Sequence, residues 1–261
     1  MNKQPLLTLL SDFGNCDEYV SVMKGVINKI NPSARIIDIS HKIPPHNIVA
    51  ARFCLMSAYD YFPQGTIHIA VVDPEVGGER RGIALELANG FLVGPDNGLF
   101  SGILSQHYVI TAVELTNNNY WYCYTPSKTF HGRDIFAPVG AHIASGIMLQ
   151  ELGTLIDPTT LVNLNLNQCI YFTDRIVGCI QYIDQFGNLV TNIPSTLLKN
   201  KSWYVQIGSL RINSYSTYTE VYLGEILALI SSHGWVEIAV NPGNAQLRLQ
   251  VELGKKISVE W

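Results

Sequence analysis

The sequence is poor in charge and has no excess of basic residues. Only 15% of its 261 residues are charged, and 17 Lys and Arg against 21 Asp and Glu give a formal net charge of −4. A protein that binds a nucleic-acid backbone needs a basic surface. We therefore expect no nucleic-acid partner.

Long apolar runs are missing as well. No stretch approaches the ~18 apolar residues that a membrane-spanning helix needs, and the Leu-Leu-Thr-Leu-Leu run at 6–10 is too short for a signal-peptide core. The five cysteines are odd in number and form no Cys-x-x-Cys pair, which is typical of reduced residues. We expect a cytoplasmic protein without membrane attachment.

Motifs for metals and phosphates are absent. The seven histidines show no His-Glu-x-x-His or other paired spacing, so we expect no metal site. Neither Gly-x-Gly-x-x-Gly nor the Gly-Lys-Ser/Thr phosphate loop occurs, which disfavours a dinucleotide or a nucleoside triphosphate.

The N-terminal part of the sequence alternates short apolar runs with segments of helical periodicity. Residues 6–10, 35–39 and 66–72 have the composition of buried parallel strands, and helical patterns lie between them, the second at 48–61. Residues 83–87 and 91–93 resemble a hairpin, and 134–148 a helix that Asp134 opens. This predicts a Rossmann-like α/β sheet domain over residues 1–158.

The pattern changes in residues 159–261, where strands follow one another closely. This predicts a smaller all-β domain. The expected strands are Ile176–Ile183, Trp203–Ile207, Glu225–Leu229, Trp235–Val240, Leu247–Val251 and Ile257–Trp261.

Two polar islands interrupt the apolar first half, at 71–81 and 129–138. Each sets ionisable groups beside glycine and proline, as loops that present charged side chains to a ligand do. Asp73, Arg80 and His131 are our candidate catalytic residues. The alternatives are that Asp73 is only a turn residue, that Arg80 is a solvated charge, and that a lone histidine is structural.

Two further segments carry candidate binding residues. Asp12 and Asp17 lie between the first strand and the first helix, where open α/β sheets bind ligands, although a turn former and a helix cap would look the same. Residues 182–193 place Asp, Phe and two Asn around a glycine, which suits stacking and edge hydrogen bonds to a planar heterocycle.

Six motifs in order along the chain resemble the S-adenosyl-L-methionine hydroxide adenosyltransferase family, whose relatives include fluorinases and chlorinases. They are Ser-Asp-Phe-Gly-x-x-Asp-x-Tyr-Val (11–20), Met-Lys-Gly-Val-Ile (23–27), Val-Val-Asp-Pro-x-Val-Gly (71–77), Gly-Pro-Asp-Asn-Gly-Leu (94–99), Thr-Phe-His-Gly-Arg-Asp-Ile-Phe-Ala-Pro (129–138) and Asp-x-Phe-Gly-Asn-Leu-x-Thr-Asn-Ile (184–193).

The resemblance implies a barrel-like C-terminal domain and a homotrimer with ligand sites between subunits. It also implies the reaction: water or hydroxide attacks C5′ of S-adenosylmethionine and yields adenosine and methionine, with no cofactor. Asp73, Arg80 and His131 would then hold and polarise the water. Which of these groups takes the proton stays open.

The same resemblance implies the residues that bind substrate. Asp12 would bind the ribose hydroxyls and Asp17 the methionine ammonium, while Phe186 and Asn188 face adenine. Where the halogenating relatives have Ser-Arg for the methionine part, this chain has Ser232 and His233. The full set of implied binding residues is Asp12, Asp17, Tyr19, Asp184, Phe186, Asn188, Asn192, Ser232, His233 and, through its backbone, Ala245.

Hydrolysis competes with two other functions. The fluorinating relatives present tyrosine at the position of Asp73 and serine at that of Gly132, and at ~4 Å in an effective dielectric near 20 an anionic Asp73 would repel a halide by about 4 kcal/mol. A non-catalytic sensor of adenosine or S-adenosylmethionine is the second alternative. We expect hydrolysis.

Overall fold

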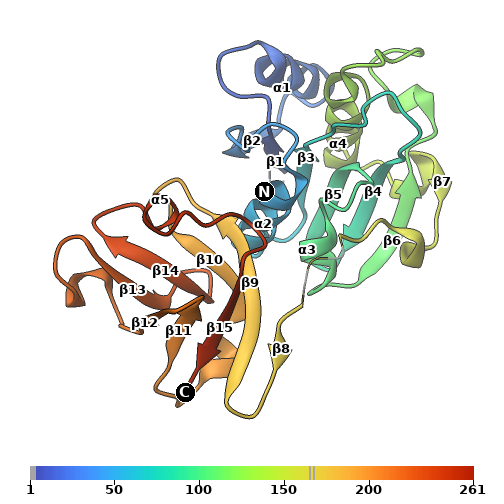
Figure 1. Ribbon diagram of the computed structural model, residues 1–261. Helices are drawn as coiled ribbons and strands as arrows, with labels where there is room; N and C mark the ends of the chain where they lie inside the picture. Colours follow the sequence, from blue (N-terminus) through green and yellow to red (C-terminus); the bar gives the residue numbers. More distant parts are fainter. Residues whose placement is uncertain (1–3, 165, 167) are drawn as a thin grey trace. The chain divides into compact units, whose positions relative to one another are not determined.

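The computed structural model describes residues 4–164, 166 and 168–261. These divide into two compact units, with the division after Leu164 (Figure 1). We describe each unit by itself.

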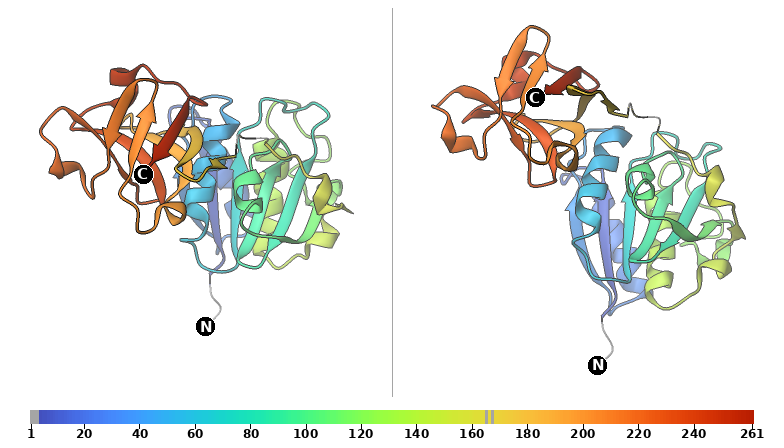
Figure 2. Two further views of the ribbon diagram at one scale, coloured as in Figure 1. Left: turned by 60° about the horizontal axis from the view of Figure 1, so that its bottom comes forward. Right: turned by 90° about the horizontal axis from the view of Figure 1, so that it is seen from below.

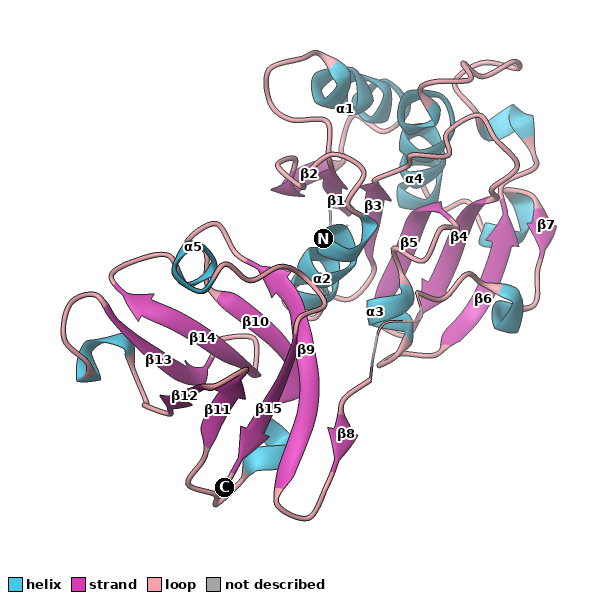
Figure 3. Cartoon of the chain, viewed as in Figure 1, coloured by secondary structure: helices cyan, strands magenta, loops and turns pink. Residues whose placement is uncertain are grey.

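The first unit is built on a seven-stranded sheet in the order β2-β1-β3-β5-β4-β6-β7 (Figure 3). Strands β2, β1, β3 and β5 run parallel to one another, and β4, β6 and β7 are antiparallel to their neighbours. The parallel strands expected at 6–10, 35–39 and 66–72 and the hairpin that follows them are confirmed. The strands are β1 (Leu6–Ser11), β2 (Arg35–Ser40), β3 (Thr66–Val71), β4 (Gly82–Leu87), β5 (Gly90–Pro95), β6 (Val109–Glu114) and β7 (Thr154–Leu155).

Helices cover both faces of this sheet (Figures 1 and 2). Successive β1 side chains point to opposite faces. Leu7 and Leu9 join the core beneath α1 and α4, whereas Thr8 bonds to His68, whose ring packs against Tyr59 of α2. The helices are α1 (Tyr19–Ile30), α2 (Ile48–Tyr59), α3 (Ser101–Leu104) and α4 (Ala137–Ala144).

The helix predicted over 134–148 differs from the observed one. It begins with a wider, π-helical turn at Gly132–Phe136, continues as α4 and ends at Ala144. Asp134 is fully buried in that turn, where it pairs with Arg133 and accepts a hydrogen bond from the Ser127 amide. Its carboxylate lies near the start of the helix, as expected, and it also holds the preceding loop in place.

The second unit is a nearly closed, barrel-like antiparallel sheet in the order β12-β11-β15-β9-β10-β14-β13, with β8 paired to β9 (Figures 2 and 3). A bridge between Ser214 and Ala228 links the two ends of that order. The strands are β8 (Ile170–Tyr171), β9 (Arg175–Ile183), β10 (Leu189–Pro194), β11 (Tyr204–Ile207), β12 (Leu210–Asn213), β13 (Glu225–Ile230), β14 (Trp235–Asn241) and β15 (Lys256–Glu260).

One predicted strand of this unit is wrong. Residues 247–251 belong largely to a short helix, α5 (Ala245–Leu249). The side chain of Asn244 accepts the amide hydrogen of Leu247 and so caps a helical turn, while Gln250 in a left-handed conformation ends it. Leu247 is 73% exposed, so the alternating apolar residues do not line one face of a sheet.

Candidate active site

Polar residues gather where the parallel strands of the first unit end. Asp12 follows β1, His41 follows β2, Asp73 follows β3 and Asp96 follows β5. Because β1, β2, β3 and β5 run parallel, these residues lie at one edge of the sheet, the edge at which open α/β sheets bind ligands.

Arg80 is in direct contact with both Asp73 and His131. The Arg80 Nε donates to both carboxylate oxygens of Asp73 at 3.0 Å, and Nη2 also bonds to Oδ2. The same Nη2 lies 2.7 Å from Nδ1 of His131. The side chains of Arg80 and Asp73 are only 6% and 4% exposed, so the pair is shielded from water and from salt screening.

Burial and the neighbouring guanidinium both favour the neutral form of the histidine. Burial, and then the positive charge of Arg80, lower the pKa of His131 below its ordinary value. Since a guanidinium only donates hydrogen bonds, Nδ1 of a neutral His131 accepts and its proton sits on Nε2. His131 therefore presents an N–H donor on its far side.

Two contacts bring the loop 72–81 against the segment that carries His131. Gly77 has φ +76°, and a Cβ there would lie 2.1 Å from the Lys128 carbonyl oxygen, so only glycine allows this approach. Arg80 also lies over the Phe136 ring, 5.4 Å from its centroid. The two polar islands of the sequence thus form one site.

An aromatic cluster joins the β1–α1 loop to the same segment. Phe130, next to His131, meets Tyr19 and Phe13 edge-on, with ring centroids 5.1 and 5.7 Å away. A Cβ on Gly132 would lie 3.1 to 3.4 Å from Met23, Phe130 and Phe13. The cluster places the loop that carries Asp12 beside the segment that carries His131.

The remaining acidic candidates of this loop are placed as follows. Oδ2 of Asp12 accepts the His46 amide at 2.8 Å, and Asp17 is exposed just before α1. Glu18 occupies the N-cap position without a side-chain cap bond, so Asp17 is not the cap of this helix.

Arg81, adjacent to Arg80, has a different partner. It binds Asp96 through Nε and Nη2 at 2.9 and 2.6 Å, and Asp96 Oδ1 accepts the Val162 amide. The two adjacent arginines therefore bind different aspartates. Of the two pairs, Asp73–Arg80 is the one that contacts His131. The sequence predicts Arg80 as the catalytic arginine, and Arg80 is the arginine that contacts His131.

In the second unit, residues 184–188 form a tight turn against the start of α5. Asp184 Oδ1 accepts the amides of Phe186 and Asn188, and Oδ2 accepts the Asn188 side-chain amide. A Cβ on Gly187 would lie within 2.3 Å of the Asn244 side chain, which places Ala245 beside the turn. Phe186 is 73% exposed.

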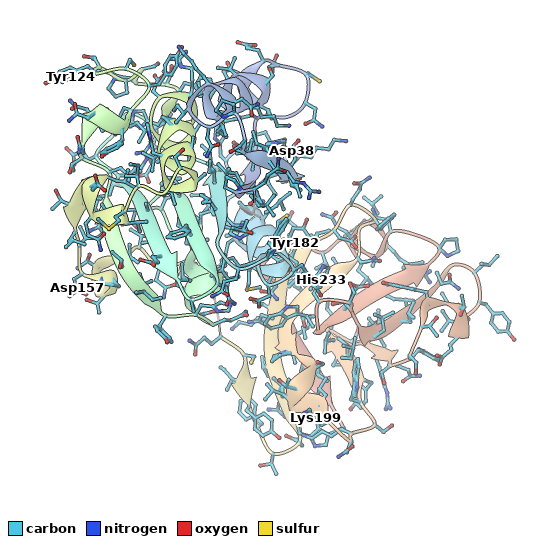
Figure 4. All side chains as sticks on the ribbon, turned by 180° about the vertical axis from the view of Figure 1, so that it is seen from behind. Asp38, Tyr124, Asp157, Tyr182, Lys199 and His233 are labelled. Carbon is cyan, nitrogen blue, oxygen red and sulfur yellow. The ribbon has the colours of Figure 1, made fainter. Side chains whose placement is uncertain are left out.

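Ser232 and His233 lie elsewhere in this unit. They are exposed in the turn before β14 (Figure 4). Strand register pairs Leu189 with Ile238 and Pro194 with Trp235, so that turn is at the Pro194 end of β10, roughly 15–20 Å from its other end. One copy of this unit does not bring Ser232 and His233 next to the 184–188 turn.

Asn192 lies within the sheet of the second unit. Its Oδ1 accepts the Cys179 amide at 2.8 Å. In this position the side-chain carbonyl helps to hold β9 against β10.

Sequence reasoning missed Ser11 and His41. Both are buried, and Ser11 Oγ lies 2.7 Å from His41 Nδ1. The available signal was the polar Ser40-His41 pair at the end of β2, the same strand-end position that singled out Asp12 and Asp73.

The part of the chain that the structure describes contains neither a cluster of metal-ligating side chains nor a helix that could span a membrane. It contains no group of three or more His, Cys, Asp or Glu side chains that could hold a metal ion. None of its helices is long and apolar enough to cross a membrane.

Comparisons with known proteins match the whole fold. The family model of the SAM hydroxide adenosyltransferase N-terminal domain matches residues 7–153, and that of the C-terminal domain matches residues 178–258. A solved structure of an uncharacterized conserved protein from Thermotoga maritima superposes with a TM-score of 0.91 at 35% identity, covering 98% of this chain and 100% of that one.

Curated relatives cover both chains almost completely. The (R)-S-adenosyl-L-methionine hydrolase of Salinispora tropica is 36% identical over 99% of each chain, and that of Methanocaldococcus jannaschii is 33% identical over 97% of this chain and 95% of its own. A fluorinase from an Actinoplanes species is 24% identical over 99% and 98%. The chain belongs to the SAM hydroxide adenosyltransferase family.

Proposed function

We propose that this protein hydrolyses S-adenosyl-L-methionine to adenosine and L-methionine. The observation that carries the proposal is the contact among Asp73, Arg80 and His131 at the carboxyl edge of the sheet, in a chain whose relatives bear the name of that hydrolase.

The chemistry suits these groups. A water oxygen bonds to C5′, the C5′–S bond breaks, and its electron pair goes to sulfur, so methionine leaves as a neutral thioether. No general acid is needed for that leaving group, and the enzyme has to align the water and accept its proton. The reaction balances without a cofactor, and we propose none.

Among the three residues, Asp73 is the proton acceptor in this proposal. Nδ1 of His131 is engaged by Arg80 and Nε2 carries a proton, so neutral His131 donates a hydrogen bond to the attacking oxygen. Asp73 Oδ1 keeps a lone pair beyond its one bond from Arg80 Nε, whereas Oδ2 accepts from both Nε and Nη2. The two-nitrogen contact with Arg80 holds the carboxylate in a fixed orientation.

Substrate binding follows the family resemblance. Asp12 binds the ribose hydroxyls, Asp17 the ammonium and the exposed Phe186 ring the adenine. Tyr19, Asp184, Asn188, Asn192, Ser232, His233 and the Ala245 backbone complete the proposed set.

We further propose a homotrimer whose sites combine residues of neighbouring subunits, and a cytoplasmic location. Within one second unit, Ser232 and His233 lie at the end of β10 opposite to the 184–188 turn.

The test is turnover of S-adenosylmethionine in ¹⁸O-labelled water without halide. We expect methionine and adenosine with label at the 5′ oxygen, because the water oxygen forms the new C5′–O bond. A halogenase would instead form a 5′-halo nucleoside when chloride is added. Adenosine binding without product would overturn the hydrolase and favour a sensor.

A further inference from the structure

The loop after β2, residues 41–47, holds the loop after β1 at three points. Ser11 Oγ lies 2.7 Å from His41 Nδ1, and the Gly14 amide donates to the His41 carbonyl at 2.8 Å. The His46 amide donates to Oδ2 of Asp12, also at 2.8 Å. These bonds flank Asp12 on both sides in the sequence and reach its carboxylate.

His41 is itself anchored from the opposite side. Its Nε2 lies 3.2 Å from Oδ1 of Asp38, and Lys24 Nζ lies 2.6 Å from the other oxygen. Burial raises the pKa of the Asp38 carboxyl, but the hydrogen bond from Lys24 and the close contact with His41 leave it lowered overall. Asp38 lies on β2 (Figure 4), so the anchor is a strand of the sheet.

Ser11 Oγ joins the two loops. It accepts the Phe13 amide hydrogen at 3.3 Å and lies 2.7 Å from Nδ1 of His41, while Nε2 of His41 faces Asp38 at 3.2 Å. Asp38, His41 and Ser11 therefore form one continuous series of contacts that ends where the loop of Asp12 begins.

Ser, His and Asp also form hydrolytic triads, but this set cannot work as one. Ser11 and His41 are 1% and 6% exposed, so a substrate does not reach the hydroxyl. A serine nucleophile must meet its substrate directly. The role that remains is to orient the loop that begins at Ser11.

We propose that Asp38, His41 and Ser11 are positioning residues that orient Asp12, and through it set the preference of the site for nucleosides with ribose hydroxyls. This rests on the proposed function, in which Asp12 binds those hydroxyls. The His46 amide fixes the orientation of the carboxylate through Oδ2, and further lone pairs remain to accept from the ribose hydroxyls. A small rotation of the loop would misalign those bonds.

The test compares adenosine with 2′,3′-dideoxyadenosine, which lacks the hydroxyls. We expect Ser11→Ala and His41→Gln each to weaken adenosine binding about tenfold, as loss of one well-aligned bond to a charged group would. Binding of the dideoxy compound should change less than about twofold. For S-adenosylmethionine, KM should rise and kcat stay nearly constant, since ribose contacts act equally before and during reaction.

Two variants serve as controls. Thr8→Val removes another buried hydroxyl-to-histidine bond, from Thr8 Oγ1 to His68 Nδ1 at 2.8 Å, in the middle of the same sheet; it should lower stability and leave the nucleoside preference unchanged. His41→Asn places an amide oxygen near the position of Nδ1 and should recover part of the preference that His41→Gln loses.

Equal weakening of both nucleosides in the Ser11 and His41 variants would overturn the inference and leave the proposed function standing. A Thr8→Val variant with the same loss of preference would also overturn it. Wild-type protein that binds neither nucleoside would overturn the proposed function together with this inference. Should Ser11→Ala fail to fold, Asp38→Asn, at the outer end of the set, is expected to show the same preference change in weaker form.

Discussion

Asp73 and Asp96 are two carboxylates in the same edge of one sheet, each bound to one of two adjacent arginines. Their side chains are 4% and 3% exposed, so burial does not separate them. What separates them is the third partner. Arg80 continues to His131, whereas Arg81 continues to Thr160 in the connection toward the second unit. At the residue scale, we therefore assign catalysis to one pair and stability to the other.

Asp73→Asn tests that assignment. We expect kcat to fall by roughly 10²- to 10⁴-fold, because the amide cannot accept the proton of water, while the affinity for adenosine changes little. Asp96→Asn is the matched control and should lower the melting temperature with kcat nearly unchanged. Equal losses of kcat in the two variants, measured by release of methionine, would contradict the assignment.

We expect the titration of His131 to determine how activity depends on pH. Its pKa lies below the ordinary 6.5 because of burial and the charge of Arg80, and protonation would remove the acceptor that Arg80 uses. We therefore expect activity to be present at higher pH and to be lost as pH falls through this lowered pKa. We expect the acid limb of kcat/KM below 6.5, and His131→Asn, which retains an acceptor but does not titrate, should shift or abolish it. An acid limb above 6.5 in the wild type would be inconsistent with a histidine in this environment.

At the scale of elements, the site depends on loops that are pressed against each other. The turn at Gly77 packs its α-carbon onto the backbone at Lys128, and the π-helical turn after His131 begins at Gly132, beneath three side chains. A loop cannot move at one of these points without moving the contact between Arg80 and His131. The β1–α1 loop is held in the same way by Ser11 and His41.

Gly77→Ala should therefore reduce both stability and kcat. The left-handed conformation costs an L-residue about 1–2 kcal/mol, and the new Cβ would also collide with the Lys128 carbonyl. Gly146→Ala is the control, because Gly146 has φ +92° but no neighbour within 4 Å of a Cβ. We expect it to show the conformational cost alone in denaturant unfolding, with unchanged kcat. A Gly77 variant that matches Gly146→Ala in both measurements would show that the close approach has no role.

At the scale of the whole molecule, the candidate residues belong to two units. The first unit contains Asp73, Arg80 and His131, and the second contains Phe186 and Asn188. A homotrimer with shared sites makes a specific prediction about mixtures of inactive variants.

We expect Asp73→Asn and Phe186→Ala proteins, each weakly active alone, to regain activity when they are unfolded, mixed and refolded together. Random assembly would combine an intact first unit with an intact second unit of a neighbour in about a quarter of the sites. Light scattering should report three times the protomer mass. Activity that never exceeds the sum of the two separate variants would contradict shared sites.

The sequence predicted much of this protein because much of the signal is local. Runs of buried Ile and Val predict parallel strands wherever they occur, and polar residues after β1 and β3 predict a site at one edge. The prediction for residues 247–251 was wrong for the same reason. Their alternating apolar residues predicted a strand, but the side chain of Asn244 caps a helix there. The alternation alone carried no information about that bond.

By itself, the sequence determined the two-part α/β and all-β architecture, the family and the three candidate catalytic residues, since these depend on hydrophobic periodicity and on contiguous motifs. Only the tertiary structure showed that Arg80 contacts His131, which nitrogen of His131 is engaged, and that Asp38, His41 and Ser11 form one series of contacts beside the Asp12 loop. Arg80 and His131 are 51 positions apart and Ser11 and His41 are 30 apart. Such contacts arise from strand order and loop packing, which no local pattern of residues encodes.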